Sequence, residues 1–139
     1  MEPLTLPGTL DSLGAVANYV MTAAAQAGLD KSKSYKLRLA VDEIATNIII
    51  YGYEEARTQG NLDLQANIDD ASLTISIEDT AKHFDPFSKL AAEEEKIPLP
   101  LEERPIGGLG VYLAIQGVDK FFYERVGERN RNTFVVNRS

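Results

Sequence analysis

The feature that most constrains the fold is a pair of segments in which apolar and polar residues alternate strictly. The apolar positions are Leu62, Leu64, Ala66 and Ile68 in the first segment and Leu73, Ile75 and Ile77 in the second. A period of two residues places such side chains on one face of a β-strand. The turn-forming pair Asp69-Asp70 separates the segments, so the pattern predicts an antiparallel hairpin with one buried face.

Helical periodicity precedes this hairpin. Apolar residues recur at three- and four-residue spacing in two stretches, residues 13–24 and 37–49, which indicates two amphipathic helices. Gly28 is expected to end the first helix, and Gly52 is expected to end the second, which begins near residues 32–34. A short strand is expected at residues 4–6, before the helices.

The remaining part of the chain predicts a long loop, a helix and a second hairpin. Residues 80–106 hold four of the six prolines and few periodic apolar positions, as in a lid or a binding loop. The elements expected after it are a helix over 111–115, a strand over 118–124, a turn over 127–132 and a last strand over 133–136. This order predicts an α+β two-layer sandwich, with helices on one face of a mainly antiparallel sheet, in a single domain spanning 1–139.

Composition excludes several classes of function. The chain has 139 residues and no cysteine, so disulfides, thiolate metal sites and cysteine nucleophiles are excluded. The formal net charge is −7 and the basic residues are scattered, which argues against nucleic acid as the main partner. There is no signal-peptide pattern and no apolar run long enough for a membrane span, so a cytoplasmic protein is expected.

The first segment with chemical potential is Asp42–Asn47, inside the second predicted helix. Glu43 and Asn47 are four residues apart and therefore share one helix face. Burying an unpaired polar group costs about 1–3 kcal/mol, and a hard cation with phosphate would compensate such a pair. An amide oxygen suits Mg²⁺, and a carboxylate can accept a proton. Taken alone, the pair fits better with an ordinary amphipathic helix that carries two solvated side chains, because polar pairs at this spacing are common.

Two further segments carry candidate ligand contacts. The second predicted strand of the hairpin ends at Asp79, and an aspartate there can accept a hydrogen bond from an exocyclic amine such as that of adenine; a capping role in a turn is the alternative. The glycines of 107–110 precede a helix, where close backbone approach and unpaired N–H groups favour an anion. A flexible hinge is the alternative for these glycines.

In this order and at these separations, the three segments resemble the N, G1 and G2 boxes of the GHKL ATPases, which share the Bergerat ATP-binding fold. The phrases LRLAVDEIATNIIIYGY, IEDTAKHFDPF and PIGGLGVYLAIQGVD are similar to those of the stand-alone anti-sigma-factor serine/threonine kinases. The resemblance covers residues 4–136. It implies a mixed, mostly antiparallel sheet with helices on one face.

The resemblance also implies a role for each matching residue. Asn47 would bind Mg²⁺ and, through it, the phosphates of ATP, and Glu43 would be the general base that activates a hydroxyl of a partner protein. Asp79 would recognise the adenine amine, and Thr133 would support that contact through its hydroxyl or a water. The ATP lid would span about 82–106. The other nucleotide-binding candidates are Ala81, Phe84, Arg104, Gly107, Gly108, Leu109, Gly110 and Val111.

Three residues depart from the family pattern or stand outside it. Ala81 occupies the place of a G1-box glycine, so a methyl group could crowd the adenine or restrict the backbone if a positive φ is needed there. Tyr51 stands where the family often has histidine, which would alter one pocket wall. His83 is the only histidine and is interpreted as a solvated loop residue rather than a catalytic one.

The function that the resemblance implies is transfer of a phosphoryl group from ATP, with Mg²⁺, to a serine or threonine of a STAS-domain antagonist. The expected partners are that antagonist, a sigma factor or both, and the protein could form a homodimer. One alternative, motivated by Ala81, is a module that sequesters a partner without kinase activity, with or without nucleotide. Another is the detached catalytic domain of a two-component system, which would need a separate histidine-bearing chain.

Overall fold

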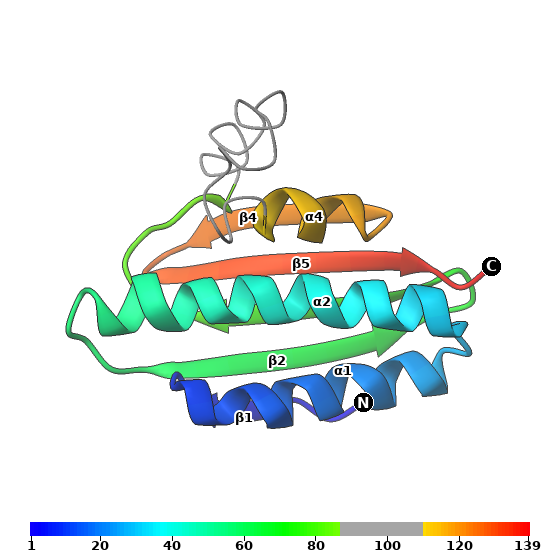
Figure 1. Cartoon of the computed structure of the whole chain (residues 1–139), viewed down its shortest axis with the longest axis horizontal. Coiled ribbons are helices and arrows are strands. Elements are labelled where there is room, and N and C mark those ends of the chain that lie inside the picture. The colour runs from blue at the N-terminus through cyan, green and yellow to red at the C-terminus, as the bar shows by residue number, and fades with distance from the viewer. Residues whose placement is uncertain (87–109) are drawn as a thin grey trace, which may run out of the picture.

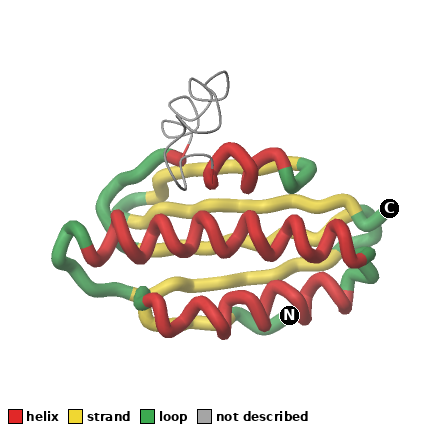
Figure 2. The backbone as a smooth tube through the Cα atoms, viewed as in Figure 1, coloured by secondary structure: helices red, strands yellow, loops and turns green. Residues whose placement is uncertain are grey.

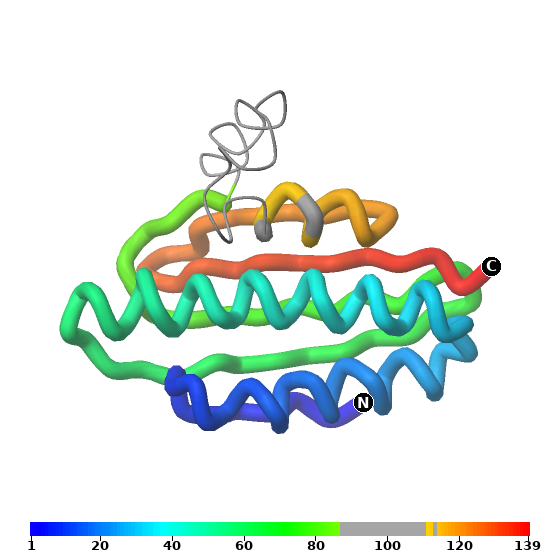
Figure 3. The backbone as a smooth tube through the Cα atoms, viewed as in Figure 1, coloured from blue at the N-terminus to red at the C-terminus, as the bar shows by residue number. Residues whose placement is uncertain are grey.

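A five-stranded sheet forms one layer of the protein, and helices cover one face of it (Figure 1). The structure is a computed structural model that describes residues 1–86 and 110–139. The strands are β1 (Leu4–Pro7), β2 (Asn61–Ile68), β3 (Ser72–Asp79), β4 (Lys120–Val126) and β5 (Arg129–Asn137). Their order is β1-β2-β3-β5-β4, and the four pairings between them are antiparallel. The C-terminal strand therefore lies inside the sheet (Figure 3).

The helices of the described residues form the second layer (Figure 2). They are a 3₁₀ turn (Leu10–Ser12), α1 (Leu13–Gln26), α2 (Lys31–Asn47), a π-helix (Ile48–Glu54) and α4 (Gly110–Gln116). Asp30 caps α2 by accepting a hydrogen bond from the backbone N–H of Lys33 at 2.8 Å. Gly28 follows α1 with a φ of 74°, the left-handed conformation that glycine supplies after a helix. The predicted two-layer α+β sandwich is confirmed.

The second predicted helix does not end at Gly52. Beyond α2 the backbone continues as the π-helix, in which hydrogen bonds span five residues: Glu55 N–H donates to Ile50 O at 2.9 Å and Thr58 N–H to Tyr53 O at 3.0 Å. A Cβ atom added at Gly52 would lie 2.7 Å from the Cβ of Ala81. Gly52 therefore permits a close approach between helix and loop instead of ending the helix.

The second hairpin differs from its prediction in the position of the turn. The expected turn over 127–132 is wrong, because only Gly127 and Glu128 connect β4 to β5. Gly127 has a φ of 61°, which makes this tight reversal possible. β5 then begins at Arg129 and alternates between a half-buried and a buried face. Residues 129–132 are polar on both faces, so their sequence is typical of a turn although they form a strand.

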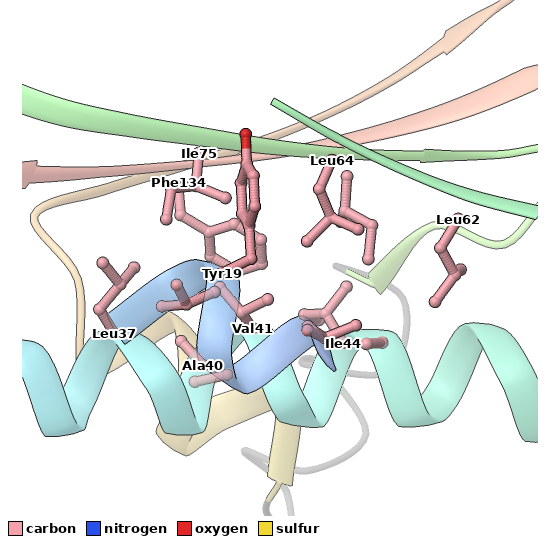
Figure 4. Packing of buried hydrophobic residues seen from close by; sticks show 14 of the residues in the cluster. Tyr19, Leu37, Ala40, Val41, Ile44, Leu62, Leu64, Ile75 and Phe134 are labelled. Atoms are coloured by element: carbon pink, nitrogen blue, oxygen red, sulfur yellow. The ribbon is translucent and has the colours of Figure 1, made fainter. Parts of the chain in front are cut away.

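The hydrophobic core lies between the sheet and the helices (Figure 4). Phe134 of β5 and Ile75 of β3 are register partners and are fully buried, and Leu37 of α2 packs in the same cluster. Tyr19 of α1 is anchored by its hydroxyl, which accepts from Ala66 N–H at 3.0 Å and donates to Glu2 O at 2.8 Å. Burial of this apolar layer is the main stabilising contribution to the fold.

The opposite face of the sheet carries charged side chains. Arg129 contacts Asp63 and Glu78, while Arg131 contacts Glu78 and Glu124. These pairs run across β2, β3, β5 and β4, as cross-strand neighbours do. A polar outer face is typical of an antiparallel sheet that is packed on one side only. Within the described residues, no helix is long and apolar enough to cross a membrane.

Candidate functional site

A pocket lies at the end of the buried layer, between the C-terminal part of α2 with its π-helix and the adjoining ends of β3 and β5. Its lining residues are Ile44, Asn47, Ile48, Gly52, Asp79, Ala81, Lys82, Phe84, Pro86, Asn130 and Asn132. The empty volume is about 310 Å³, but much of it is narrow or open to solvent. Between these side chains there is room for about one water molecule. The lining combines apolar walls with a small group of buried polar side chains, as ligand pockets do.

Asp79, the last residue of β3, is the charged group of this pocket. Its side chain is buried, with 1% exposure. Oδ1 accepts hydrogen bonds from the backbone N–H of Ala81 and from Asn130 Nδ2, both at 2.9 Å. Oδ2 is buried and accepts no hydrogen bond from the described residues. Burial raises the pKa of Asp79, although the hydrogen bonds from Asn130 and Ala81 oppose this shift.

Asn130 of β5 lies opposite Asp79 in the strand register. Besides Asp79, its Nδ2 contacts the backbone oxygens of Ala81 and Lys82, each at 3.1 Å. Its Oδ1 accepts a hydrogen bond from the hydroxyl of Tyr123 at 2.5 Å. Every polar atom of this amide therefore has a partner. Asn130 fixes both the carboxylate of Asp79 and the loop that follows β3.

Asn132 lies two residues further along β5, on the same face as Asn130. It is 2% exposed and lines the pocket. Its Oδ1 is buried and accepts no hydrogen bond from the described part of the chain. Neither asparagine was expected in the site, because the sequence pattern predicted a turn over residues 127–132. The signal that could have revealed them is the period of two that runs backward from Phe134 and Val136 through Asn132 and Asn130.

Thr133 was expected to support the contact between Asp79 and adenine through its hydroxyl or a water, and its position in the sheet contradicts this expectation. Thr133 is half-buried and pairs with Ser76, three residues away from Asp79 on β3. Its neighbours Asn132 and Phe134 occupy the buried face, so Thr133 lies on the other face of the sheet. The side chain that holds Asp79 is Asn130.

The structure brings Asn47 to the same pocket as Asp79. Asn47, the last residue of α2, is 5% exposed and lines the pocket. Glu43 is half-buried one helical turn earlier and does not belong to the lining. Tyr51, which was expected to change one pocket wall, is 39% exposed and is not part of the described lining. An amide oxygen of the Asn47 type suits Mg²⁺.

Ala81 and Phe84 both line the pocket. Among the described residues that are not glycine, a positive φ occurs at Arg57 and not at Ala81, so the methyl group of Ala81 causes no backbone strain. It packs against the open face of Gly52. Arg125 donates to Ala81 O at 3.1 Å. Together these contacts hold the start of the loop after β3 in one place.

Tyr53 of the π-helix supports the same loop from the other side. Its hydroxyl oxygen accepts a hydrogen bond from Thr80 N–H at 3.0 Å and donates to Asn61 O at 2.9 Å. Two glycines pack closely against this side chain. A Cβ atom added at Gly8 would lie 2.5 Å from a ring carbon of Tyr53, and one added at Gly60 would lie 2.6 Å from its hydroxyl oxygen. Through Tyr53, the backbone of Thr80 is therefore connected to both β2 and the π-helix.

The third predicted segment is described only in part. Gly110 begins α4, which packs against α2, and Val111 is fully buried in the core. The phosphate-binding role expected of these two residues stays a prediction. The predicted residues outside the described part of the chain are Arg104, Gly107, Gly108 and Leu109, together with residues 87–106 of the expected lid.

The polar lining suits a ligand that donates hydrogen bonds from its edge. Asp79 Oδ2 and Asn132 Oδ1 are buried acceptors with no donor among the described residues. An unsatisfied buried acceptor costs about 1–3 kcal/mol. A ligand that supplies N–H groups there would recover this cost.

Comparisons with known proteins identify the family and the fold of the chain. A family profile described as the histidine kinase-like ATPase domain matches residues 6–136, which is nearly the whole chain. No curated protein sequence matches the chain significantly. The fold is similar to the crystal structure of the RsbU and RsbW domains of Rv1364c from Mycobacterium tuberculosis, with a TM-score of 0.64 and 17% identity over 98% of this chain and 32% of that one.

Two histidine kinases are also similar in structure. One is the histidine kinase domain from Erythrobacter litoralis EL346 blue-light activated histidine kinase, with a TM-score of 0.52 and 16% identity over 91% of this chain and 59% of that one. The other is Acinetobacter baumannii histidine kinase AdeS, with a TM-score of 0.52 and 13% identity over 100% of this chain and 68% of that one. At these identities the similarities establish the fold alone. The chain spans about a third of the Rv1364c structure and about three-fifths of the first histidine kinase.

Proposed function

This chain belongs to the histidine kinase-like ATPase domain family, within the GHKL superfamily, and we propose that it binds ATP in the pocket around Asp79. The observation that carries this proposal is the buried carboxylate oxygen Oδ2 of Asp79, which accepts no hydrogen bond within the described residues. The exocyclic amine of adenine is a donor that matches it. The apolar walls formed by Ile44, Ile48 and Phe84 suit the faces of a purine ring.

Asn47 would hold Mg²⁺ at the other side of the bound nucleotide. Its carboxamide oxygen is of the type that Mg²⁺ accepts, and it lines the same pocket as Asp79. Within the described residues no group of three His, Cys, Asp or Glu side chains could hold a metal ion. The other ligands of the cation would be phosphate oxygens of the nucleotide. When bound, Mg²⁺ would neutralise charge on those oxygens.

We further propose that the bound ATP serves phosphoryl transfer to a serine or threonine of a STAS-type antagonist protein. Glu43 would accept the proton of the hydroxyl as its oxygen bonds to the γ-phosphorus, and the bond to the bridging oxygen of ADP would break. The sequence resemblance to anti-sigma-factor kinases supports this assignment. The position of Glu43 on the face of α2 that carries Asn47, one turn away, agrees with it.

A second candidate function is a module that sequesters a partner, such as a sigma factor, without transferring phosphate. The narrowness of the pocket favours it, because the space between the lining side chains has room for about one water molecule. An adenine ring would have to displace part of the wall formed by Ala81 and Phe84. Under this function, ATP would bind weakly or not at all.

Calorimetry with ATP and Mg²⁺ tests whether the nucleotide binds. We expect binding by the wild-type protein and at least a ~100-fold loss of affinity in Asp79→Asn, because a site built to pair a ligand amine discriminates strongly once that pairing is lost. Asp70→Asn, the same change at an exposed turn residue, should leave the affinity unchanged. Absence of any binding by the wild-type protein would favour the sequestering module.

The kinase step is tested separately with Glu43→Gln. We expect this variant to bind ATP with an affinity within about threefold of the wild type and to phosphorylate a serine of a STAS-type protein about 10²–10⁴-fold more slowly, the usual contribution of a general base. Glu128→Gln, an exposed residue of the β4–β5 turn, is the matched control. A Glu43→Gln variant that transfers phosphate at the wild-type rate would show that another residue is the base.

A further inference from the structure

We propose that Asn132 determines base specificity: together with Asp79 it forms a pair of buried acceptors that selects a purine carrying a primary amine. This inference rests on the proposed binding of ATP and extends it, since it assigns the choice of base to a residue outside the family motif. Asn132 stands in β5, not in the three motif segments. It concerns the chemical class of the nucleotide and not the fate of its phosphates.

The first observation is the difference between the two asparagines of β5. Asn130 is satisfied within the protein, because its Nδ2 contacts Asp79 and two backbone oxygens and its Oδ1 accepts from Tyr123. Asn132 is equally buried, but its Oδ1 accepts nothing from the described residues. Buried polar atoms normally have a partner. Asn130 therefore has a structural role, whereas the acceptor of Asn132, unpaired among the described residues, is available to a ligand.

The second observation is the strand register, which places these two acceptors, both unpaired within residues 1–86 and 110–139, near each other. Asp79 pairs with Asn130, and Ile77 pairs with Asn132. Asp79 and Asn132 are therefore diagonal neighbours across β3 and β5, on the face that lines the pocket. Such diagonal positions are about 7–8 Å apart and remain within reach of each other's longer side chains. A single small group between them can contact both.

The chemistry of the 6-position of a purine decides which group fits. The primary amine of adenine has two N–H groups, one for Asp79 Oδ2 and one for Asn132 Oδ1. The oxo group of hypoxanthine or guanine is itself an acceptor, so at this position it offers no N–H to Asp79 or Asn132 and adds repulsion. Mispairing of this kind rejects the wrong ligand strongly, by about 10⁴–10⁵ in the best cases. Removing one acceptor should therefore weaken the preference for the amine, and removing both should abolish it.

The test is a double-mutant-type cycle in which one change is made in the ligand and the other in the protein. Calorimetry with Mg²⁺ measures the dissociation constant of each combination. One ligand is ATP and the other is purine riboside triphosphate, which carries hydrogen in place of the amine. The wild-type protein should prefer ATP by about 100-fold or more, and Asn132→Leu, which keeps the side-chain shape, should reduce this preference at least about tenfold. Thr133→Val, the next residue on the same strand but on the other face, should leave the preference unchanged.

The outcomes separate this inference from the proposed function. If the wild type binds ATP and Asn132→Leu retains the full preference for the amine, Asn132 does not read the base and the inference is overturned, while ATP binding stands. If the wild type binds neither nucleotide, the proposed function fails and the inference with it. Should Asn132→Leu not fold, the wild-type affinity for N6-methyl-ATP decides. Loss of one N–H is expected to weaken binding about tenfold, and an unchanged affinity would refute the acceptor pair.

Discussion

The two ends of the β3–β5 pair have the same geometry and opposite chemistry. At one end Leu73 pairs with Val136 and Ile75 with Phe134, and all four side chains are buried and apolar. At the other end Asp79 pairs with Asn130, and both are buried and polar. The strand register and the helical cover continue from one end to the other. The difference teaches that the same rigid sheet positions can serve two purposes. The apolar end stabilises the sheet, and under the proposed function the polar end would hold a ligand.

The largest expected effect comes from breaking the apolar end. Phe134→Ala removes a fully buried aromatic side chain and should lower the free energy of unfolding by about 3–5 kcal/mol. Urea denaturation measures this change. ATP affinity per folded molecule should change less than about threefold, because Phe134 does not line the pocket. A large loss of affinity in a fully folded variant would contradict the division between the two ends.

A smaller effect is expected where the helical layer meets the polar end. Gly52→Ala places a Cβ atom 2.7 Å from Cβ of Ala81, and such overpacking typically costs about 1–3 kcal/mol. Ala81→Gly removes the opposing methyl group. In that background Gly52→Ala should cost less, and the double-mutant cycle measured by denaturation gives the coupling. If the changes in the free energy of unfolding are additive, the contact between positions 52 and 81 does not limit how closely the π-helix approaches the loop after β3.

The polar end should also make stability depend on pH. Burial raises the pKa of Asp79 above 3.8, so between 3.8 and the raised value the native state retains a proton that the unfolded chain has lost. The free energy of unfolding contributed by this group therefore falls as the pH rises through that range. Asp79→Asn should flatten this part of the pH profile, as measured by denaturation at a series of pH values. Identical slopes in both proteins would exclude Asp79 as the titrating group.

The smallest effect is expected on the outer face of the sheet. Arg131 is 36% exposed and contacts Glu78 and Glu124, and exposed ion pairs contribute about 0–1 kcal/mol. Arg131→Ala should therefore lower the free energy of unfolding by less than about 1 kcal/mol and should leave ATP affinity unchanged. Denaturation with and without added salt checks this expectation. A loss as large as that of Phe134→Ala would mean that the charged face stabilises the sheet as much as the core does.

The apolar end of the molecule could be predicted well from the sequence. Alternation from Leu62 to Ile77 revealed the first hairpin, and spacing of three and four revealed α1 and α2. These patterns are reliable because one face of each element must be buried. Asp79 could be proposed because it ends such an alternating strand. The alternation rule could therefore predict a pocket residue only where that residue adjoins an apolar pattern, as Asp79 does.

The polar end was harder to predict for a physical reason. Asn130 and Asn132 are buried polar residues that alternate with Arg129 and Arg131, so no hydrophobic signal marks them as a strand. Their assignment depends on partners distant in sequence, such as Asp79 and Glu78. Gly52 was misinterpreted in the same way, since its reason for being glycine is Ala81 of another segment. Local pattern rules carry no information about such contacts.

The close packing of Gly8 and Gly60 against Tyr53 limits which substitutions this sequence can accept in evolution. The ring fills the space that any side chain at Gly8 or Gly60 would need, and its hydroxyl holds the amide of Thr80 beside Asp79. A larger residue at either glycine therefore requires a smaller residue at position 53, and also a shift of Gly60 O or of Thr80 Oγ1, which would lie 2.9 Å and 2.8 Å from the added Cβ atoms. Loss of the tyrosine hydroxyl would release the loop next to Asp79. Among descendants that keep the pocket, the three positions should be inherited as a set.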